Sequence, residues 1–179
     1  ILPTSLCSGQ IANRIAERLN TLGIGRKVGI ERFVSLAHTE GCGVSSGGEQ
    51  KYRPTMLGYL THPSVRYALL LEHGCEKTHN DYMRLAMQDL GLSAKRFGWA
   101  SIQLDGGIEA VTQKVEYWFR EKIQDSAQQK TVGLESLRLG LMSIGEMNSE
   151  MTRVFANLSS AIVSAGGSVV MPETLLKKN

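Results

Sequence analysis

A run of five apolar residues in the middle of the chain, 67–71, sets the strongest limit on its architecture. A strand with one face in water alternates apolar and polar residues, whereas a strand covered on both faces is apolar throughout. The run therefore predicts a buried strand in a parallel sheet with helices on both faces.

Strand-like and helix-like segments alternate along the rest of the chain. We expect strands at 1–3, 33–37, 67–71, 99–104, 137–142 and 168–171. We expect helices at 8–22, with Ser8 as its cap, and at 52–60, 80–90, 107–128 and 151–164. This order predicts an α/β fold, a Rossmann-like three-layer arrangement of a mostly parallel sheet with helices on both faces. A polar stretch at 125–131 predicts a boundary between two parts of the chain.

Composition narrows the class of protein. The net charge is +3 and the basic residues are scattered, which disfavours nucleic acid as a partner. The longest apolar run falls far short of the roughly 20 residues that cross a bilayer, so no membrane association is expected. Three cysteines do not pair off evenly, which favours reduced thiols and a cytoplasmic protein. The chain starts at Ile1 within a strand-like segment, so we expect it to be a piece of a longer protein.

The three cysteines all follow expected strands. Cys7 comes after the first strand, Cys42 after the second and Cys75 after the third. Ligands of open parallel sheets bind outside the carboxyl ends of the strands. If the three strands are neighbours, the three thiols meet at one edge of the sheet.

Other potential metal ligands lie beside two of these cysteines. His38 and Glu40 precede Cys42, and His73 and Glu76 flank Cys75. Thiolate and imidazole ligands suit iron or zinc. Isolated cysteines are, however, more often small buried apolar residues, and no Cys-x-x-Cys pair, phosphate-binding loop or dinucleotide fingerprint is present. The spacing of these residues alone does not decide between a metal site and ordinary buried cysteines.

Four ordered segments resemble a known family, the altronate and galactarate dehydratases. They are TSLC at 4–7, HTEGCG at 38–43, GYLTHPSV at 58–65 and HGCE at 73–76. The resemblance runs from about residue 3 to residue 104 and more loosely to 173. It implies that 1–130 is the central α/β domain of a dehydratase and that 131–179 is the truncated start of a following α/β segment.

The resemblance also implies an activity. Such enzymes are hydro-lyases that dehydrate hexarate or hexonate sugar acids, such as galactarate or altronate, to 2-keto-3-deoxy sugar acids. They need a divalent metal, typically iron(II). Independently of the resemblance, three thiolates could also hold an iron–sulfur cluster. The expected partners are the sugar-acid substrate, the remaining N- and C-terminal domains of the parent protein and further copies of it in a homo-oligomer. The isolated piece can be inactive without those domains.

Dehydration next to a carboxylate needs a base and electrostatic stabilisation of the enediolate. We assign these roles to the residues at the strand ends. The expected catalytic residues are His38, His73 and Glu40; the expected metal ligands are Cys7, Cys42, Cys75 and Glu76; and Lys51 and Arg53 are expected to bind the substrate carboxylates. Glu40 and Glu76 can equally orient an imidazole, and Lys51 and Arg53 can simply be a solvated helix face.

One segment departs from the family pattern. Where the family has a Gln-Cys-Gly-Gly-Ser-Asp-like motif, this chain has SIGEMN at 143–148 and lacks the thiol. Without this thiol, we expect this member of the family either to use altered chemistry or to bind a different sugar acid. Two hypotheses therefore remain beside the dehydratase: a non-catalytic Rossmann-like domain that binds a small anion or a partner chain, and a redox domain with a disulfide.

Overall fold

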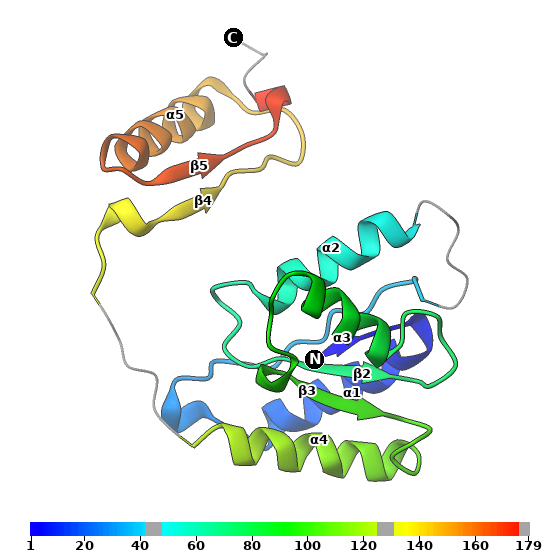
Figure 1. The fold of residues 1–179 in the computed structure, drawn as a ribbon. Coiled ribbons are helices and arrows are strands. Elements are labelled where there is room, and N and C mark those ends of the chain that lie inside the picture. The colour runs from blue at the N-terminus through cyan, green and yellow to red at the C-terminus, as the bar shows by residue number, and fades with distance from the viewer. Residues whose placement is uncertain (42–47, 125–130, 176–179) are drawn as a thin grey trace. The chain divides into compact units, whose positions relative to one another are not determined.

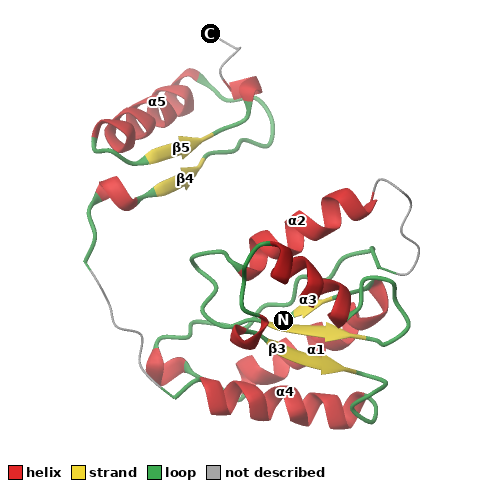
Figure 2. Cartoon of the chain, in the orientation of Figure 1, coloured by secondary structure: helices red, strands yellow, loops and turns green. Residues whose placement is uncertain are grey.

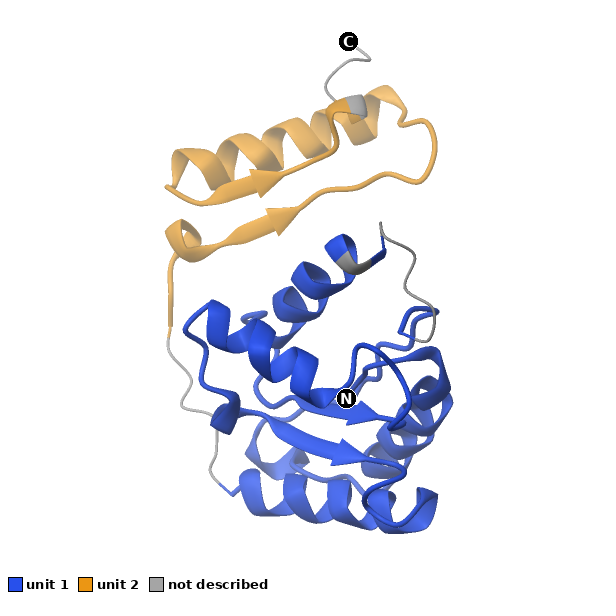
Figure 3. Cartoon of the chain, turned by 45° about the vertical axis from the view of Figure 1, so that its right-hand side comes forward, with its two compact units in different colours: residues 1–127 blue, residues 128–179 orange. Residues whose placement is uncertain are grey.

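The computed structural model describes residues 1–41, 48–124 and 131–175, which form two compact units. Unit 1 comprises residues 1–127 and unit 2 comprises residues 128–179 (Figure 3). Each unit contains helices and short parallel strands, so the chain is of the mixed α/β class (Figure 2). Within the described part of the chain, no helix combines the length and apolarity needed to cross a membrane.

Unit 1 is built around a three-stranded sheet in the order β1-β2-β3. Both strand pairs are parallel, with Leu2 opposite Leu70 and Leu70 opposite Trp99. The strands are β1 (Leu2–Pro3), β2 (Leu69–Glu72) and β3 (Gly98–Ser101), and the helices are α1 (Leu6–Thr21), α2 (Gly48–Leu60), α3 (Asn80–Asp89) and α4 (Ile108–Lys122) (Figure 1).

Strand β2 is buried on both faces, as the apolar run predicted. Leu69 and Leu71 pack into one apolar cluster with residues of α1 and α4. Leu70 points the other way and packs with residues of α2 and α3. Side chains alternate along a strand, so an uninterrupted apolar sequence supplies both clusters at once.

The second expected strand, 33–37, is wrong: this part of the described chain is extended but is not a strand. The side-chain amide of Asn20 forms hydrogen bonds with the N–H and the carbonyl of Phe33, which a neighbouring strand would otherwise bond. Its Nδ2 donates to the Phe33 carbonyl over 2.8 Å, and its Oδ1 accepts from the Phe33 N–H over 2.7 Å. Two further bonds join this segment to Ile1, just before β1: the Ile1 amino group donates to the Val34 carbonyl over 2.7 Å, and the Leu36 N–H donates to the Ile1 carbonyl over 3.3 Å.

The first helix begins earlier than predicted. Its N-cap is Ser5, not Ser8, and Ser8 Oγ instead accepts a 3.3 Å hydrogen bond from the Ser5 N–H. Ser8 lies three positions after Ser5, which is the spacing of a reciprocal capping arrangement. Cys7 therefore lies in the first turn of α1 and not in a loop before it. Helix α4 also ends earlier than predicted, at Lys122.

Unit 2 is a single strand–helix–strand unit. Strands β4 (Arg138–Gly140) and β5 (Ser168–Val170) pair in parallel in a sheet of their own, and α5 (Ser149–Ser164) connects them. Asn148 caps α5, since its Oδ1 accepts a 2.8 Å hydrogen bond from the Met151 N–H. Strands β4 and β5 do not pair with β1–β3, so the described strands form two separate sheets.

The burial of β2 leads to a stability prediction. Leu70 is 0% exposed and Leu85, on the outer face of α3, is 62% exposed. We expect Leu70→Ala to lower the free energy of unfolding of unit 1 by about 2–5 kcal/mol, because it leaves a cavity in a packed core. The control Leu85→Ala should change it by less than about 0.5 kcal/mol. Urea unfolding followed by tryptophan fluorescence measures this, since Trp99 and Trp118 both lie in unit 1. Equal effects of the two variants would contradict the two-sided burial.

Candidate functional site

The loops after β1 and β2 lie side by side because the two strands are parallel neighbours. Pro3 pairs with Leu71, and the Thr4 N–H donates to the Leu71 carbonyl over 2.9 Å. The chain then leaves β1 through Thr4 and Ser5, and leaves β2 through residues 73–76. Both exits are at the carboxyl edge of the sheet, where ligands of parallel sheets bind.

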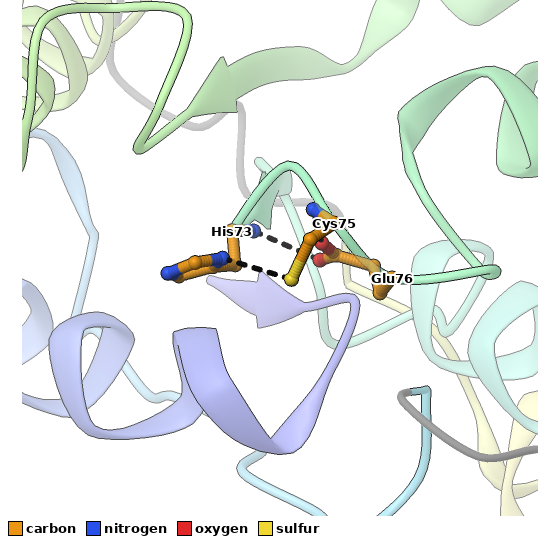
Figure 4. A group of neighbouring side chains, drawn as sticks. All are labelled: His73, Cys75 and Glu76. Carbon is orange, nitrogen blue, oxygen red and sulfur yellow. Dashed lines mark hydrogen bonds between the residues drawn. The ribbon is translucent and has the colours of Figure 1, made fainter.

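Three potential ligand residues gather in the loop after β2. One ligand atom each from His73, Cys75 and Glu76 lie within 4.8 Å of one another (Figure 4). The Cys75 Sγ points toward the imidazole and lies 3.3 Å from the His73 Nδ1. Cys75 is exposed and His73 is half-buried, so both side chains can reach a ligand from solvent.

The Glu76 carboxylate holds this loop together. Glu76 is only 3% exposed, and five donors from described residues converge on its carboxylate. Its Oε1 accepts from Thr4 Oγ1 over 2.7 Å, Ser5 Oγ over 3.1 Å and the His73 N–H over 2.8 Å. Its Oε2 accepts from the Gly74 N–H over 2.7 Å and the Cys75 N–H over 3.0 Å.

These hydrogen bonds set the charge of Glu76. Burial by itself would raise the pKa of a carboxyl group. The bonds from Thr4, Gly74 and His73 outweigh burial and lower the pKa of Glu76 from 4.5 to about 2. The carboxylate is therefore ionised at neutral pH, and its oxygens are already occupied by protein donors.

A second set of contacts fixes the exit of β1. The Thr4 carbonyl accepts from Thr78 Oγ1 over 2.7 Å and from the Tyr52 hydroxyl over 3.2 Å. Burial raises the pKa of Tyr52, so its hydroxyl stays protonated and keeps donating. Thr4, Ser5 and Thr78 are fully or almost fully buried. The sequence alone assigned no role to these contacts, although small polar residues next to an expected strand end are a recognisable signal.

The loop before Cys42 docks on the same edge. The Leu6 N–H donates to the Glu40 carbonyl over 2.9 Å, and the Lys77 N–H donates to the Gly41 carbonyl over 3.2 Å. Gly41 has a φ of 110°, and a Cβ there would lie 2.7 Å from atoms of Ser5. Cys42 itself, an expected metal ligand, lies outside the described residues.

His38 is engaged on both ring nitrogens. Its Nε2 lies 2.8 Å from the Pro3 carbonyl, which can only accept, so this nitrogen carries the proton. Its Nδ1 accepts a 3.1 Å hydrogen bond from the Glu40 N–H. In this arrangement neither nitrogen of His38 has a lone pair free to take a proton from a substrate.

The remaining expected site residues lie outside this cluster of described residues. Cys7 is exposed in the first turn of α1, and the Glu40 side chain is exposed. On α2, Lys51 is exposed and Arg53 forms an ion pair with Asp89 at the end of α3, with 2.5 Å between Nη2 and Oδ2. The roles that we assigned to these residues stay predictions.

Comparison with known families identifies unit 1. Residues 1–127 match the family described as D-galactarate dehydratase/Altronate hydrolase, second domain. The chain belongs to this family. The match covers the whole of unit 1 and confirms the resemblance drawn from the four sequence segments. No match was found among curated proteins or among solved structures.

In this galactarate dehydratase/altronate hydrolase domain, the hydrogen bonds of Glu76 lead to a pH prediction. We expect Glu76→Gln to lower the unfolding free energy at pH 7 by about 1–3 kcal/mol, because an amide cannot accept all of the converging donors. The pKa of Glu76 is lower in the folded state, so its contribution is full above pH 4.5 and is lost as the pH falls toward 2.

Urea unfolding at several pH values between 7 and 2 tests this, with the exposed Glu17→Gln as the control. Wild type and Glu17→Gln should both lose stability between about pH 4.5 and 2, whereas Glu76→Gln should lose less over the same range. An unchanged pH profile in Glu76→Gln would show that this carboxylate is not held by the hydrogen bonds described.

The docking of Gly41 gives a further prediction. Gly41→Ala should destabilise unit 1 by more than about 1 kcal/mol, since the backbone is in the left-handed region and Ser5 blocks a Cβ. Gly58→Ala, in the exposed face of α2 with nothing within 4 Å, should instead stabilise it by about 0.5–1 kcal/mol. Opposite signs in urea unfolding are the expected result, and a stabilising Gly41→Ala would refute the close approach to Ser5.

Proposed function

We propose that unit 1 carries the metal centre of a hydro-lyase that dehydrates hexarate or hexonate sugar acids, such as galactarate or altronate, to 2-keto-3-deoxy acids. Family membership supports the reaction class. The observation that carries the proposal is the pairing of His73 and Cys75 at the carboxyl edge of the sheet, on a loop whose backbone N–H groups donate to Glu76. A functional cluster in this place is what an open parallel sheet favours.

The donor set fits the iron(II) that the family resemblance implies. A thiol beside an imidazole suits iron or zinc, whereas magnesium and calcium prefer oxygen ligands. We assign Cys75 as a ligand, with Cys7 and Cys42 as the further thiols of the set. Glu76 is better placed to orient the loop than to bind metal, because protein donors already occupy both of its oxygens. Three thiols would also be compatible with an iron–sulfur cluster, which stays the alternative cofactor.

When bound, such an ion supplies Lewis-acid stabilisation to a developing enediolate and a leaving hydroxyl. The protein must supply the base. His73 is the better candidate than His38, whose ring nitrogens are both engaged. We assign Nδ1 of His73 as the donor to the Cys75 sulfur, which would leave the lone pair of the imidazole on Nε2. That nitrogen would take the proton next to the substrate carboxylate.

The parent protein is proposed to be larger than this chain. The family description calls the matched part a second domain, which supports a parent enzyme with at least one other domain. The sequence resemblance implies domains on both sides of it. We infer that unit 1 is the Rossmann-like three-layer domain of that enzyme and that unit 2 begins the following segment. A cytoplasmic location and a homo-oligomeric assembly stay predictions.

Unit 2 does not supply a thiol to the proposed site. The family's cysteine position falls in the loop after β4, where this chain has residues 143–148. Here the Ser143 hydroxyl donates to the Gly145 carbonyl over 3.1 Å, and Asn148 caps α5. We therefore propose that all thiol ligands come from unit 1.

Iron analysis of anaerobically purified protein tests the proposal. The wild-type chain should hold near-stoichiometric iron(II), and Cys75→Ser should bind it at least about tenfold more weakly. His73→Ala should retain iron but dehydrate galactarate about 10²–10⁴-fold more slowly, as expected for loss of a base. The matched control is His62→Ala, an exposed histidine whose Nδ1 accepts from the Ser64 N–H, and it should keep both properties.

Absence of iron from the wild-type chain after reconstitution with ferrous iron would reject the metal centre. A non-catalytic domain that binds a small anion or a partner chain would then be the better explanation. Iron binding without dehydration by the wild-type chain would support the metal centre and would place the missing catalytic groups in other domains of the parent.

A further inference from the structure

A cavity of about 320 Å³ opens at the carboxyl ends of β2 and β3, next to the loop that carries His73 and Cys75. Glu72 and Gly74, which flank His73 in sequence, both line it. Its volume lies at the lower end of the range of small-molecule sites. The cavity takes its walls from unit 1 alone, from β2, β3, α3, α4 and the loops that follow the strands.

One wall carries a buried polar group without a partner. Asn80 is 4% exposed at the start of α3. Its N–H donates to Glu72 Oε2 over 2.6 Å, and its Nδ2 donates to the Ala100 carbonyl over 3.0 Å. Within the described structure its Oδ1 accepts no hydrogen bond. Buried acceptors of this kind are rare in proteins, and Asn80 is one of the residues that line the cavity.

Ser101 adds a hydroxyl to the same cavity. It is buried at the end of β3, and its N–H is held by Asp105 Oδ2 over 2.8 Å. Its Oγ accepts a long 3.4 Å bond from the Leu104 N–H, which leaves the hydroxyl proton unused by that contact. The group can therefore donate to a ligand oxygen.

An aromatic ring and a guanidinium also line the cavity. The Trp99 ring is fixed by its indole N–H, which donates to the Ala94 carbonyl over 3.0 Å. The guanidinium of Arg84 lies 4.4 Å from the centre of the ring. An aromatic face beside converging polar groups is the combination that holds a small polar ligand with carbon–hydrogen faces, such as a sugar chain.

Charge decides which part of a sugar acid the cavity suits. Three carboxylates line it, from Glu72, Asp81 and Asp105. Its two cations are already paired, Arg84 with Asp81 over 2.5 Å and Lys114 with Asp105 over 2.7 Å. A substrate carboxylate would meet excess negative charge here, whereas neutral hydroxyl groups would find both donors and acceptors.

We propose that this cavity binds the hydroxylated chain of the sugar-acid substrate, with the reacting carboxylate directed toward the loop at 73–76. The inference rests on the proposed function for its substrate class. It assigns Asn80, Ser101 and Trp99 as the residues that distinguish a polyhydroxylated acid from an unsubstituted one.

NMR titration of the full chain in the presence of a chelator tests this without iron. The two tryptophan indole signals are assigned with Trp118→Phe, because the chain has two tryptophans. Galactarate or D-altronate should shift the Trp99 signal and leave that of Trp118 in place. Adipate and hexanoate, which have the same six carbons without hydroxyls, should shift neither.

Ser101→Ala should weaken binding of the sugar acid up to about tenfold. The control is Arg96→Ala, whose arginine stacks on Phe97 outside the cavity, and it should leave binding unchanged.

Equal shifts with adipate and galactarate, or no Trp99 shift with either sugar acid, would overturn the inference. Binding by Ser101→Ala as tight as that of wild type would overturn it as well. Failure of the proposed function is a separate result, since it is measured by the iron content and not by the indole signals.

Discussion

Burial of the Glu76 carboxylate is the constraint on which the rest of the candidate site depends. A charge removed from water is costly unless hydrogen bonds replace its hydration, and here five described donors do so. Two of these donors, Thr4 and Ser5, follow β1, and three are backbone N–H groups of the loop after β2. The carboxylate thus joins the exits of two strands, and His73 and Cys75 are held in a defined geometry as a result.

The parallel sheet makes this junction possible, and it also places the proposed sugar-chain cavity. Side chains alternate along β2, so Leu71 faces the cluster of α1 and α4, while Leu70 faces that of α2 and α3. Glu72, two residues after Leu70, lies on the side of α3 and reaches Asn80 there. The proposed metal loop and the cavity are therefore neighbouring features at the end of β2, since Glu72 and Gly74 line the cavity.

Much of the local structure was predictable from the sequence, and the errors have identifiable causes. The apolar run at 67–71 located β2, because burial on both faces leaves a direct mark on the sequence. At 33–37 the expected strand is replaced by isolated contacts: the Asn20 side chain bonds the backbone of Phe33, and Val34 and Leu36 bond to Ile1. Nothing in the local pattern indicates the contact with Asn20. Ser8 was mistaken for a cap because two serines three residues apart are both plausible caps until the start of the helix is known.

The sequence by itself determined the family, the α/β class and the positions of His73 and Cys75 at a strand end, because these depend on local pattern and on ordered motifs. Only the tertiary structure decided that protein donors bond both oxygens of Glu76 and that the Pro3 carbonyl bonds the His38 ring. These properties come from residues far apart in the chain: Thr4 and Glu76 are separated by 72 positions, and Pro3 and His38 by 35. Parallel pairing of β1 and β2 brings the exits of the two strands together, and no local pattern contains that information.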